Sequence, residues 1–293
     1  MIRNKKSAYE REYAKYKTKI EEKLSEICGG LKNMPQILID GIKYALLDGG
    51  KRLRPTLCLA TIKMLGGVIN DKSIKLSTIL EIIHCYSLVH DDLPCMDDDD
   101  YRRNKPSTHK QFGEAMGVLI GDAMLNLSYE IGLAMVGQSK TITAALQCIA
   151  TNAGGLGIIG GQVEDIMLDE HQDHTNLDVI YIQKTASLFC ASLVSAALFV
   201  GSDSNTVSYL DQLGKHLGIA FQIKDDLDEY YNGGTSQKSQ SKITIVSAYG
   251  DTKAKEILNS HLSQANQVLQ NLSQYDISFL QTTLNQLTID PIS

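Results

Sequence analysis

Apolar residues recur at spacings of three and four along most of the chain, which is the pattern of amphipathic helices. The first such run lies in residues 7–28, where the apolar positions are Tyr9, Tyr13, Tyr16, Ile20, Leu24 and Ile27. The same pattern predicts helices at 35–48, 56–65, 74–90, 113–136, 140–152, 178–200, 214–230, 243–271 and 276–287. Strand-like alternation is almost absent, so the sequence predicts an all-α fold.

The helix predicted at 74–90 runs directly into the densest charge in the chain. Six of the ten residues that follow are aspartate: Asp91, Asp92, Asp97, Asp98, Asp99 and Asp100. Carboxylates this close repel one another, and oxygen ligands without a cysteine or histidine cluster suit a hard cation such as Mg²⁺ or Ca²⁺. Arg102 and Arg103 follow at once, which suggests that the cation arrives with a phosphate group.

The geometry of this cluster requires a bend in the backbone. Pro94 interrupts the helix, and Asp97 would lie about 240° round from Asp91 on an ideal helix. Both residues reach one ion only if the chain turns back between them.

A second apolar helix, at 214–230, also leads into acidic residues. Asp225 lies 134 residues (225 − 91) after Asp91. Asp225 and Glu229 are four residues apart and share one helix face, with Asp228 beside them. Two such helices could face each other across a cavity and hold metal ions between them.

Basic residues follow a pair of glycines in the run GGKRLRP at 49–55. The glycines end one helix and Pro55 begins the next. Lys51, Arg52 and Arg54 at a helix N-terminus form an anion cradle, with a solvated basic turn as the alternative. His84 lies two turns before Asp91 on the same helix face, where a core role and a site role both stay open.

Glycines also mark residues 154–161, which include a G-x-G-x-x-G pattern. No strand precedes this pattern, so a dinucleotide-binding fold is rejected. Glycines here favour close helix packing or a kink, which would bring Gln162 and Asp165 towards the core. Lys184 and Thr185 lie near the start of an apolar helix, and Lys184 either reaches the surface or faces a polar cavity.

Composition narrows the class of protein. The 293 residues are 43% hydrophobic and 21% charged, with a net charge of −6 and no basic patch, so we expect no nucleic-acid partner. The six cysteines are scattered, as expected of buried residues in a reducing compartment. The N-terminus lacks the apolar core of a signal peptide, and the most apolar stretch, 186–201, is shorter than the roughly 20 residues that span a bilayer. We therefore expect a cytoplasmic protein without stable membrane insertion.

Several motifs occur in a characteristic order between residues 40 and 230: GGKRLRP, HCYSLVHDDLPCMDDDDYRR, GGQVED, QKT and FQIKDD. In these the chain resembles the trans-polyprenyl diphosphate synthases, most closely the bacterial farnesyl diphosphate (geranyltransferase) enzymes. The resemblance implies one polyprenyl synthetase domain over 1–293, built as a single bundle of about ten helices around a central cavity. It also implies a homodimer that condenses isopentenyl diphosphate head-to-tail with an allylic diphosphate.

The resemblance assigns roles residue by residue. It implies Mg²⁺ ligands at Asp91, Asp92, Asp97, Asp225, Asp226 and Glu229. It implies an isopentenyl diphosphate site at Lys51, Arg54, His84 and Arg103, and an allylic diphosphate contact at Arg102. Lys184, Thr185 and Gln222 match residues beside the reacting carbons, and Lys242 matches a further substrate-binding lysine.

The chain departs from the family pattern near its C-terminal end. Glu229 replaces the last aspartate of the second acidic motif, and the usual GKxTxP motif reads Ser241-Lys242-Ile243-Thr244. A degenerate or regulatory subunit is therefore an alternative. Tyr86 and Ser87, one to two turns before Asp91, are expected to limit the growing product. A tyrosine there predicts a C15 product, with C20 as the alternative.

Overall fold

The computed structural model describes residues 7–171, 177–232 and 243–289. The chain divides into two compact units, Met1–Leu146 and Gln147–Ser293. Each unit is described by itself. The predicted substrate-binding Lys242 lies outside the described residues.

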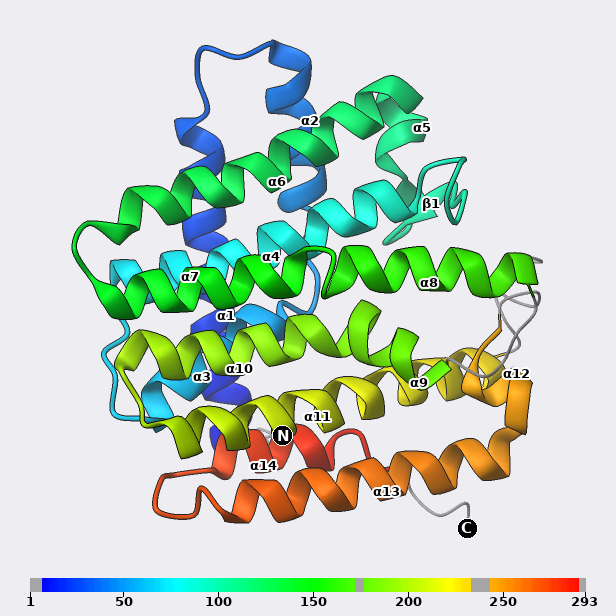
Figure 1. Ribbon diagram of the computed structural model, residues 1–293. Helices are drawn as coiled ribbons and strands as arrows, with labels where there is room; N and C mark the ends of the chain where they lie inside the picture. The colour runs from blue at the N-terminus through cyan, green and yellow to red at the C-terminus, as the bar shows by residue number, and fades with distance from the viewer. Residues whose placement is uncertain (1–6, 172–176, 233–242, 290–293) are drawn as a thin grey trace, which may run out of the picture. The chain divides into compact units, whose positions relative to one another are not determined.

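Unit 1 is built around α4 (Asp71–Asp91), whose Asn70 cap accepts a hydrogen bond from the Ser73 amide. Figure 1 shows α4 running beside α6 (Glu114–Val136). Helix α4 also packs against α1 (Ala8–Gly30), α2 (Gln36–Leu46) and α3 (Leu53–Met64). Because α4 is covered from several sides, most of its residues are buried, including Leu80, Ile82 and Ile83.

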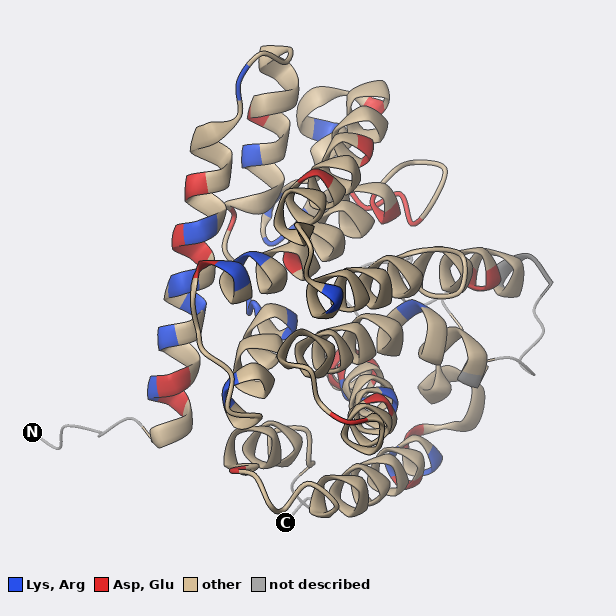
Figure 2. Cartoon of the chain, turned by 60° about the vertical axis from the view of Figure 1, so that its left-hand side comes forward, with Lys and Arg blue, Asp and Glu red and all other residues tan. Residues whose placement is uncertain are grey.

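The outer helix of unit 1 carries much of the surface charge. Figure 2 shows lysine, arginine and acidic residues along α1, and its apolar face is buried at Tyr16, Ile20 and Leu24. Ser7 and Glu10 form a capping box at its start. The prediction of an amphipathic helix at 7–28 is confirmed.

The segment between α4 and α6 contains the only β-structure among the described residues. Strands β1 (Tyr101–Arg102) and β2 (Lys105–Pro106) pair antiparallel, and α5 (Thr108–Phe112) follows. The sequence predicted no regular element between the helices at 74–90 and 113–136. Each strand has two residues, which is too short for an alternating apolar pattern to reveal.

Unit 2 is built around α11 (Ser204–Tyr231), which packs between α10 (Ser187–Val200) and α13 (Asp251–Gln270). Glycines let the helices approach closely. A Cβ atom added at Gly218 would lie 2.4 Å from Ala186 Cα, and one added at Gly214 would lie 2.7 Å from Cys190 Cα. The remaining elements are α8 (Ile158–His171), α9 (Leu177–Ile180), the π-helix η2 (Tyr181–Ala186), α12 (Ile245–Tyr249) and α14 (Ser278–Asn285). Helix α7 (Lys140–Ala153) contains the boundary between the units.

The all-α fold is confirmed, and several helix boundaries differ from the prediction. The helix expected at 178–200 is interrupted by η2, and the one expected at 214–230 begins earlier, at Ser204. The segment expected at 243–271 is divided at Gly250, where the left-handed φ of +81° separates α12 from α13. Helix α8, which no periodic pattern predicted, follows the glycine-rich residues 154–157.

Three helices are long and apolar enough to cross a membrane by length and composition: Glu114–Val136, Lys140–Leu168 and Tyr181–Val200. In the last of these, 72% of the most apolar window is buried within the protein, as expected of a core helix. Four of the six cysteines are buried, while Cys95 is exposed and Cys148 is partly exposed.

Candidate active site

The aspartate-rich segment of unit 1 turns back on itself directly after α4. The amide of Asp97 donates to the carbonyl of Asp91 at 2.8 Å, and that of Asp98 donates to the carbonyl of Leu93 at 3.0 Å. Asp98 adopts a left-handed φ of +49° within this turn. The predicted bend is confirmed, and it brings the backbones of Asp91 and Asp97 together.

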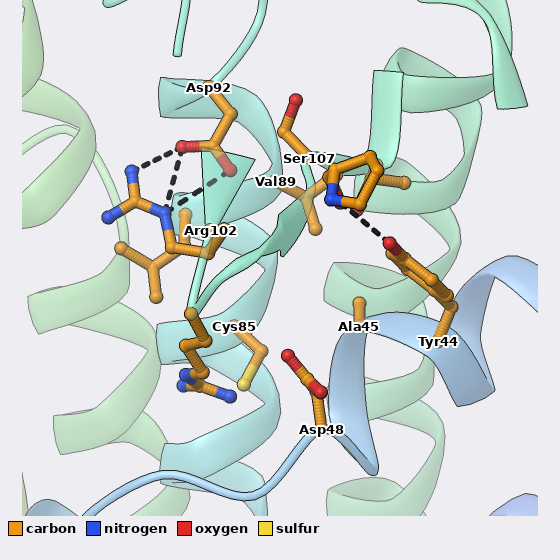
Figure 3. A pocket seen from close by; sticks show the side chains of 12 residues that line it. Tyr44, Ala45, Asp48, Cys85, Val89, Asp92, Arg102 and Ser107 are labelled. Carbon is orange, nitrogen blue, oxygen red and sulfur yellow. Dashed lines mark hydrogen bonds and ion pairs between the residues drawn. The ribbon is translucent and has the colours of Figure 1, made fainter. Parts of the chain in front are cut away.

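The second aspartate of the motif has a different environment. Asp92 is 2% exposed, and its carboxylate accepts from Nε of Arg102 at 3.0 and 3.3 Å and also from Arg102 Nη2. Figure 3 shows this fork-like pair at a small cavity. Arg102 also bonds Asp99 at 3.2 Å. In this structure Asp92 and Arg102 form a charge-assisted ion pair with each other. The metal-ligand role of Asp92 and the allylic diphosphate contact of Arg102 stay predictions.

The loop between α2 and α3 is shaped around a second arginine. Gly49 and Gly50 have φ values of +74° and +117°. A Cβ atom at Gly50 would lie 3.0 Å from Arg103 Nη2, and Arg103 Nη1 donates to the carbonyl of Gly49 at 2.8 Å. Lys51 follows on the exposed side of this loop, and its carbonyl accepts from the Tyr13 hydroxyl.

Arg52 does not belong to the predicted anion cradle. It is 2% exposed, and it donates to Glu81 Oε1 and to the carbonyl of Leu46, each at 2.6 Å. A buried ion pair of this kind makes Arg52 a structural residue that ties the loop to α4. The prediction of three ligand-binding cations is therefore wrong for Arg52.

Arg54 and Arg103 instead gather around His84. Arg54 Nη1 lies 3.5 Å from His84 Nε2. Burial, followed by the positive charges of Arg54, Arg103, Arg102 and Arg52, lowers the pKa of His84 well below its usual range. His84 is therefore neutral near pH 7. The result is a cluster of cationic side chains around a neutral imidazole, which suits an anionic ligand that brings its own charge.

In unit 2, the predicted residues near the reacting carbons lie on η2 and α11. Lys184 forms an ion pair with Asp165 of α8, which is 7% exposed. This contact favours the polar environment that was one of the two alternatives for Lys184. Gly161 allows the approach, because a Cβ atom there would lie 2.2 Å from the backbone nitrogen of Lys184. Of the two alternatives for these glycines, close packing is confirmed at Gly161, whereas residues 154–157 form the turn that precedes α8.

A hydrogen-bonded chain joins the other predicted residues of unit 2. Thr185 Oγ1 donates to Gln222 Oε1 at 2.8 Å, and Gln222 Nε2 donates to Asp226 Oδ1 at 2.8 Å. Asp226, which is 8% exposed, also accepts from the hydroxyl of Tyr181. Sequence patterns did not single out Tyr181, because a tyrosine in an apolar helix has the same signature as a core residue.

The second acidic motif has two sides. Asp225, Asp228 and Glu229 are exposed, whereas Asp226 points into the unit. Asp228 pairs with Lys224 one turn earlier. Asp225 and Glu229 lie one turn apart on α11, as the sequence predicted. The ligand role of Asp226 stays a prediction.

Tyr86 and Ser87 lie on α4 at the expected positions. Tyr86 is 3% exposed, and its ring meets that of His90 edge-on at 5.8 Å. Ser87 Oγ donates to the carbonyl of His84 at 2.9 Å. Their role in product length stays a prediction.

Unit 1 also contains a group of three side chains that could bind a metal ion and that the sequence did not reveal. One donor atom from each of Asp98, Asp100 and His109 lies within 4.8 Å of the others. His109 comes 18 residues (109 − 91) after Asp91, so no local spacing links it to the aspartates. Carboxylates dominate both this group and the Asp91–Asp97 turn, and carboxylate oxygens are the donors that Mg²⁺ prefers.

The helical fold, the two acidic motifs and the arginine cluster together define a class of all-α proteins built to bind phosphorylated ligands with a divalent cation. The chain belongs to the polyprenyl synthetase family, whose pattern it matches over residues 35–274. It is thus a polyprenyl diphosphate synthase, a short-chain trans-prenyltransferase of isoprenoid biosynthesis, in a family of soluble enzymes that typically use Mg²⁺.

Relatives with different products resemble the chain to a similar degree. It is 38% identical over 244 residues to a farnesyl diphosphate synthase of Micrococcus luteus, covering 80% of this chain and 83% of the relative. It is 36% identical over 240 residues to geranylgeranyl pyrophosphate synthase 4 of Arabidopsis thaliana, covering 78% and 64%. The crystal structure of a geranyltransferase from Legionella pneumophila superposes with a TM-score of 0.84 at 28% identity, covering 95% and 96%.

Proposed function

We propose that this chain condenses isopentenyl diphosphate head-to-tail with dimethylallyl or geranyl diphosphate and releases mainly farnesyl diphosphate. The observation that carries the proposal is the cationic cluster of Arg54 and Arg103 around neutral His84. It supports a diphosphate site in unit 1, formed by residues far apart in the sequence. The farnesyl diphosphate synthases among the relatives support the C15 product.

The isopentenyl diphosphate binds at Lys51, Arg54, His84 and Arg103. The two guanidinium groups bind phosphate oxygens in forks, and Lys51 adds a flexible point charge. Arg103 is held by the Gly49 carbonyl at 2.8 Å, so part of the cost of ordering this side chain is met before the ligand binds.

Of the six predicted Mg²⁺ ligands, we propose Asp91 and Asp97 of unit 1 and Asp225 and Glu229 of unit 2 as those that bind the metal directly. The other two are bonded to protein side chains, Asp92 to Arg102 and Asp226 to Tyr181 and Gln222. The donor oxygens of the four proposed ligands fit a hard cation, and the backbone bond between Asp97 and Asp91 presents two of them together. Mg²⁺ held by these residues would supply positive charge to the allylic diphosphate and would make it a better leaving group.

The protein contributes oxygen dipoles to this reaction and no nucleophilic side chain, because the substrate itself is the nucleophile. The allylic C–O bond breaks, its electron pair leaves with the diphosphate, and the double bond of isopentenyl diphosphate attacks the allylic cation. Loss of a proton to the released diphosphate restores a neutral double bond. Thr185 and Gln222 present oxygen lone pairs that stabilise the cation, and Lys184 offers a positive charge to the diphosphate as it leaves.

Product length is assigned to Tyr86. Its ring is almost fully buried on α4, five residues before Asp91, and a tyrosine ring is large enough to stop a further isoprene unit. A C20 product is the second candidate, because geranylgeranyl diphosphate synthases are also among the relatives. We further propose a homodimer located in the cytoplasm, as the family resemblance suggests.

The experiment resolves the products of the wild type and of Tyr86→Ala by chain length, with labelled isopentenyl diphosphate and geranyl diphosphate. The wild type should stop mainly at C15, and Tyr86→Ala should extend the product to C20 or beyond with little loss in the first condensation. Ser87→Ala, a smaller change one residue away, should shift the distribution less. An unchanged distribution in Tyr86→Ala removes Tyr86 as the limit, and a C20 product from the wild type supports the second candidate.

A further inference from the structure

We propose that Tyr181 is a positioning residue for the condensation, and that it acts through Asp226 to fix Gln222 and Thr185. The inference rests on the proposed function and extends it to a residue outside the recognised motifs. It also gives Asp226 a role distinct from metal binding: the carboxylate is the centre of a hydrogen-bonded ladder between η2 and α11.

The ladder follows from the spacing of its four residues. Tyr181 and Thr185 lie four residues apart on η2, and Gln222 and Asp226 lie four residues apart on α11. Residues at this spacing share a helix face. Tyr181 meets Asp226 at one end, and Thr185 meets Gln222 at 2.8 Å at the other. The bond from Gln222 to Asp226, also 2.8 Å, closes the ladder along α11.

Asp226 determines the orientation of the Gln222 amide. Both carboxylate oxygens are used: Oδ1 accepts from Gln222 Nε2 and Oδ2 accepts from Tyr181. A carboxylate only accepts hydrogen bonds, so the NH₂ group of Gln222 must face it and Oε1 must face Thr185. The hydroxyl hydrogen of Thr185 is thereby committed to Gln222. Its oxygen lone pairs stay available to a developing positive charge.

Tyr181 is placed to hold Asp226 in this role. It is 6% exposed, and its hydroxyl also accepts from the backbone amide of Ile245 at 3.0 Å, at the start of α12. The hydroxyl therefore donates once and accepts once, and it links η2, α11 and α12. The Ile245 amide donates to this hydroxyl, and Asp226 can only accept, so the hydroxyl hydrogen must point to Asp226.

The π-helical conformation of η2 supports the same interpretation. Its last bond runs from the Ser187 amide to the carbonyl of Ile182, five residues earlier. Single π-turns of this kind are frequently found at functional sites. The wider turn also carries Lys184, which is anchored to Asp165. The position of η2 is thus fixed by two contacts, that of Tyr181 with Asp226 of α11 and that of Lys184 with Asp165 of α8.

The test is a double-mutant cycle on the full chain, with Tyr181→Phe, Gln222→Met and the double variant. Tyr181→Phe should lower kcat about 10- to 100-fold while both diphosphate KM values and the Mg²⁺ concentration for half-maximal activity change by less than about twofold. The double variant should be no slower than Gln222→Met alone, because both substitutions break one chain of contacts. Tyr249→Phe, at an exposed tyrosine of α12, is the matched control and should behave as the wild type.

Three outcomes overturn the inference. They are an unchanged kcat in Tyr181→Phe, losses that multiply in the double variant, and a loss that added Mg²⁺ restores, since the last would make Asp226 a metal ligand. If Tyr181→Phe does not fold, Asp226→Asn replaces it, with the same expectation of lower kcat at an unchanged Mg²⁺ requirement. A wild type that consumes no isopentenyl diphosphate overturns the proposed function itself, whereas an active wild type with an unaffected Tyr181→Phe overturns only this inference.

Discussion

Arg52 and Arg54 stand two residues apart and have opposite surroundings. Arg52 is buried against Glu81 of α4, whereas Arg54 lies 3.5 Å from His84 in the proposed diphosphate site. The sequence predicted a basic loop but could not distinguish these roles. Arg52 adopts a left-handed φ of +53°, a local conformation that a pattern of charges does not reveal. At the scale of single residues, charge pattern predicts where a site lies, and backbone conformation decides which side chains take part.

Asp91 and Asp92 should respond differently to the same substitution. Asp91→Asn should abolish turnover with little change in stability, because it removes one charge from a repelling cluster. Asp92→Asn should lower the free energy of unfolding by about 1–2 kcal/mol, because it weakens charge-assisted bonds to Arg102. That figure is modest because the Arg102 side chain is 36% exposed. Urea unfolding and steady-state turnover of both variants check this, and equal stability of the two would contradict the structural role of Asp92.

His84 should couple ligand binding to proton uptake. The free protein holds His84 neutral because its pKa is lowered, and a bound diphosphate adds negative charge that raises this pKa. Between the lowered and the raised pKa, binding therefore takes up a proton. At lower pH His84 is already protonated in the free protein, and at higher pH it is neutral in both the free and the ligand-bound protein. The proton uptake therefore disappears at both extremes.

Calorimetry at about pH 6.5, in two buffers of different ionisation enthalpy, measures this uptake. The wild type should take up more protons per isopentenyl diphosphate than His84→Gln, which serves as the control for protons that belong to the ligand. An identical uptake in the two proteins would show that the imidazole is not beside the bound diphosphate.

At the scale of elements, the apolar periodicity predicted most helices, and it failed where one or two residues change the local geometry. The π-turn of η2 adds a residue to one turn, which a pattern of threes and fours does not register. The strands β1 and β2, with two residues each, are likewise too short for the periodic pattern to predict. Among the glycines of 154–161, close packing holds for Gly161, and the sequence could not reveal its partner, the backbone of Lys184.

Gly161→Ala should test that packing. Its new Cβ atom would lie 2.2 Å from the Lys184 nitrogen and 2.6 Å from its Cα, and both are backbone atoms that no rotamer change can move. We expect a loss of stability of about 1–3 kcal/mol and a lower kcat, since η2 must shift. Gly155→Ala is the control, because nothing lies within 4 Å of its Cβ position. Thermal unfolding and turnover of both variants decide the matter, and a Gly161→Ala protein as stable and active as Gly155→Ala would refute it.

At the scale of the whole molecule, the order of motifs predicted the family, which the match over residues 35–274 confirms. The match extends across both compact units, and the single polyprenyl synthetase domain over 1–293 stays a prediction. The order of motifs could not predict the product length, because a farnesyl diphosphate synthase and a geranylgeranyl pyrophosphate synthase are almost equally similar to the chain. The motifs indicate the shared chemistry, while the limit on product length proposed at Tyr86 stays a prediction.

The most direct measurement is the steady-state kinetics of the purified chain with isopentenyl and geranyl diphosphate, compared with those of Arg54→Ala. The wild type alone should turn over both substrates in the presence of Mg²⁺ and stop when the metal is chelated. Arg54→Ala should raise the KM for isopentenyl diphosphate about 10- to 100-fold, the effect of losing about 1.5–3 kcal/mol of charge-assisted binding. The KM for geranyl diphosphate should stay within about twofold. Equal effects on both KM values, or no Mg²⁺-dependent turnover by the chain alone, would contradict the assignment of this arginine cluster to isopentenyl diphosphate.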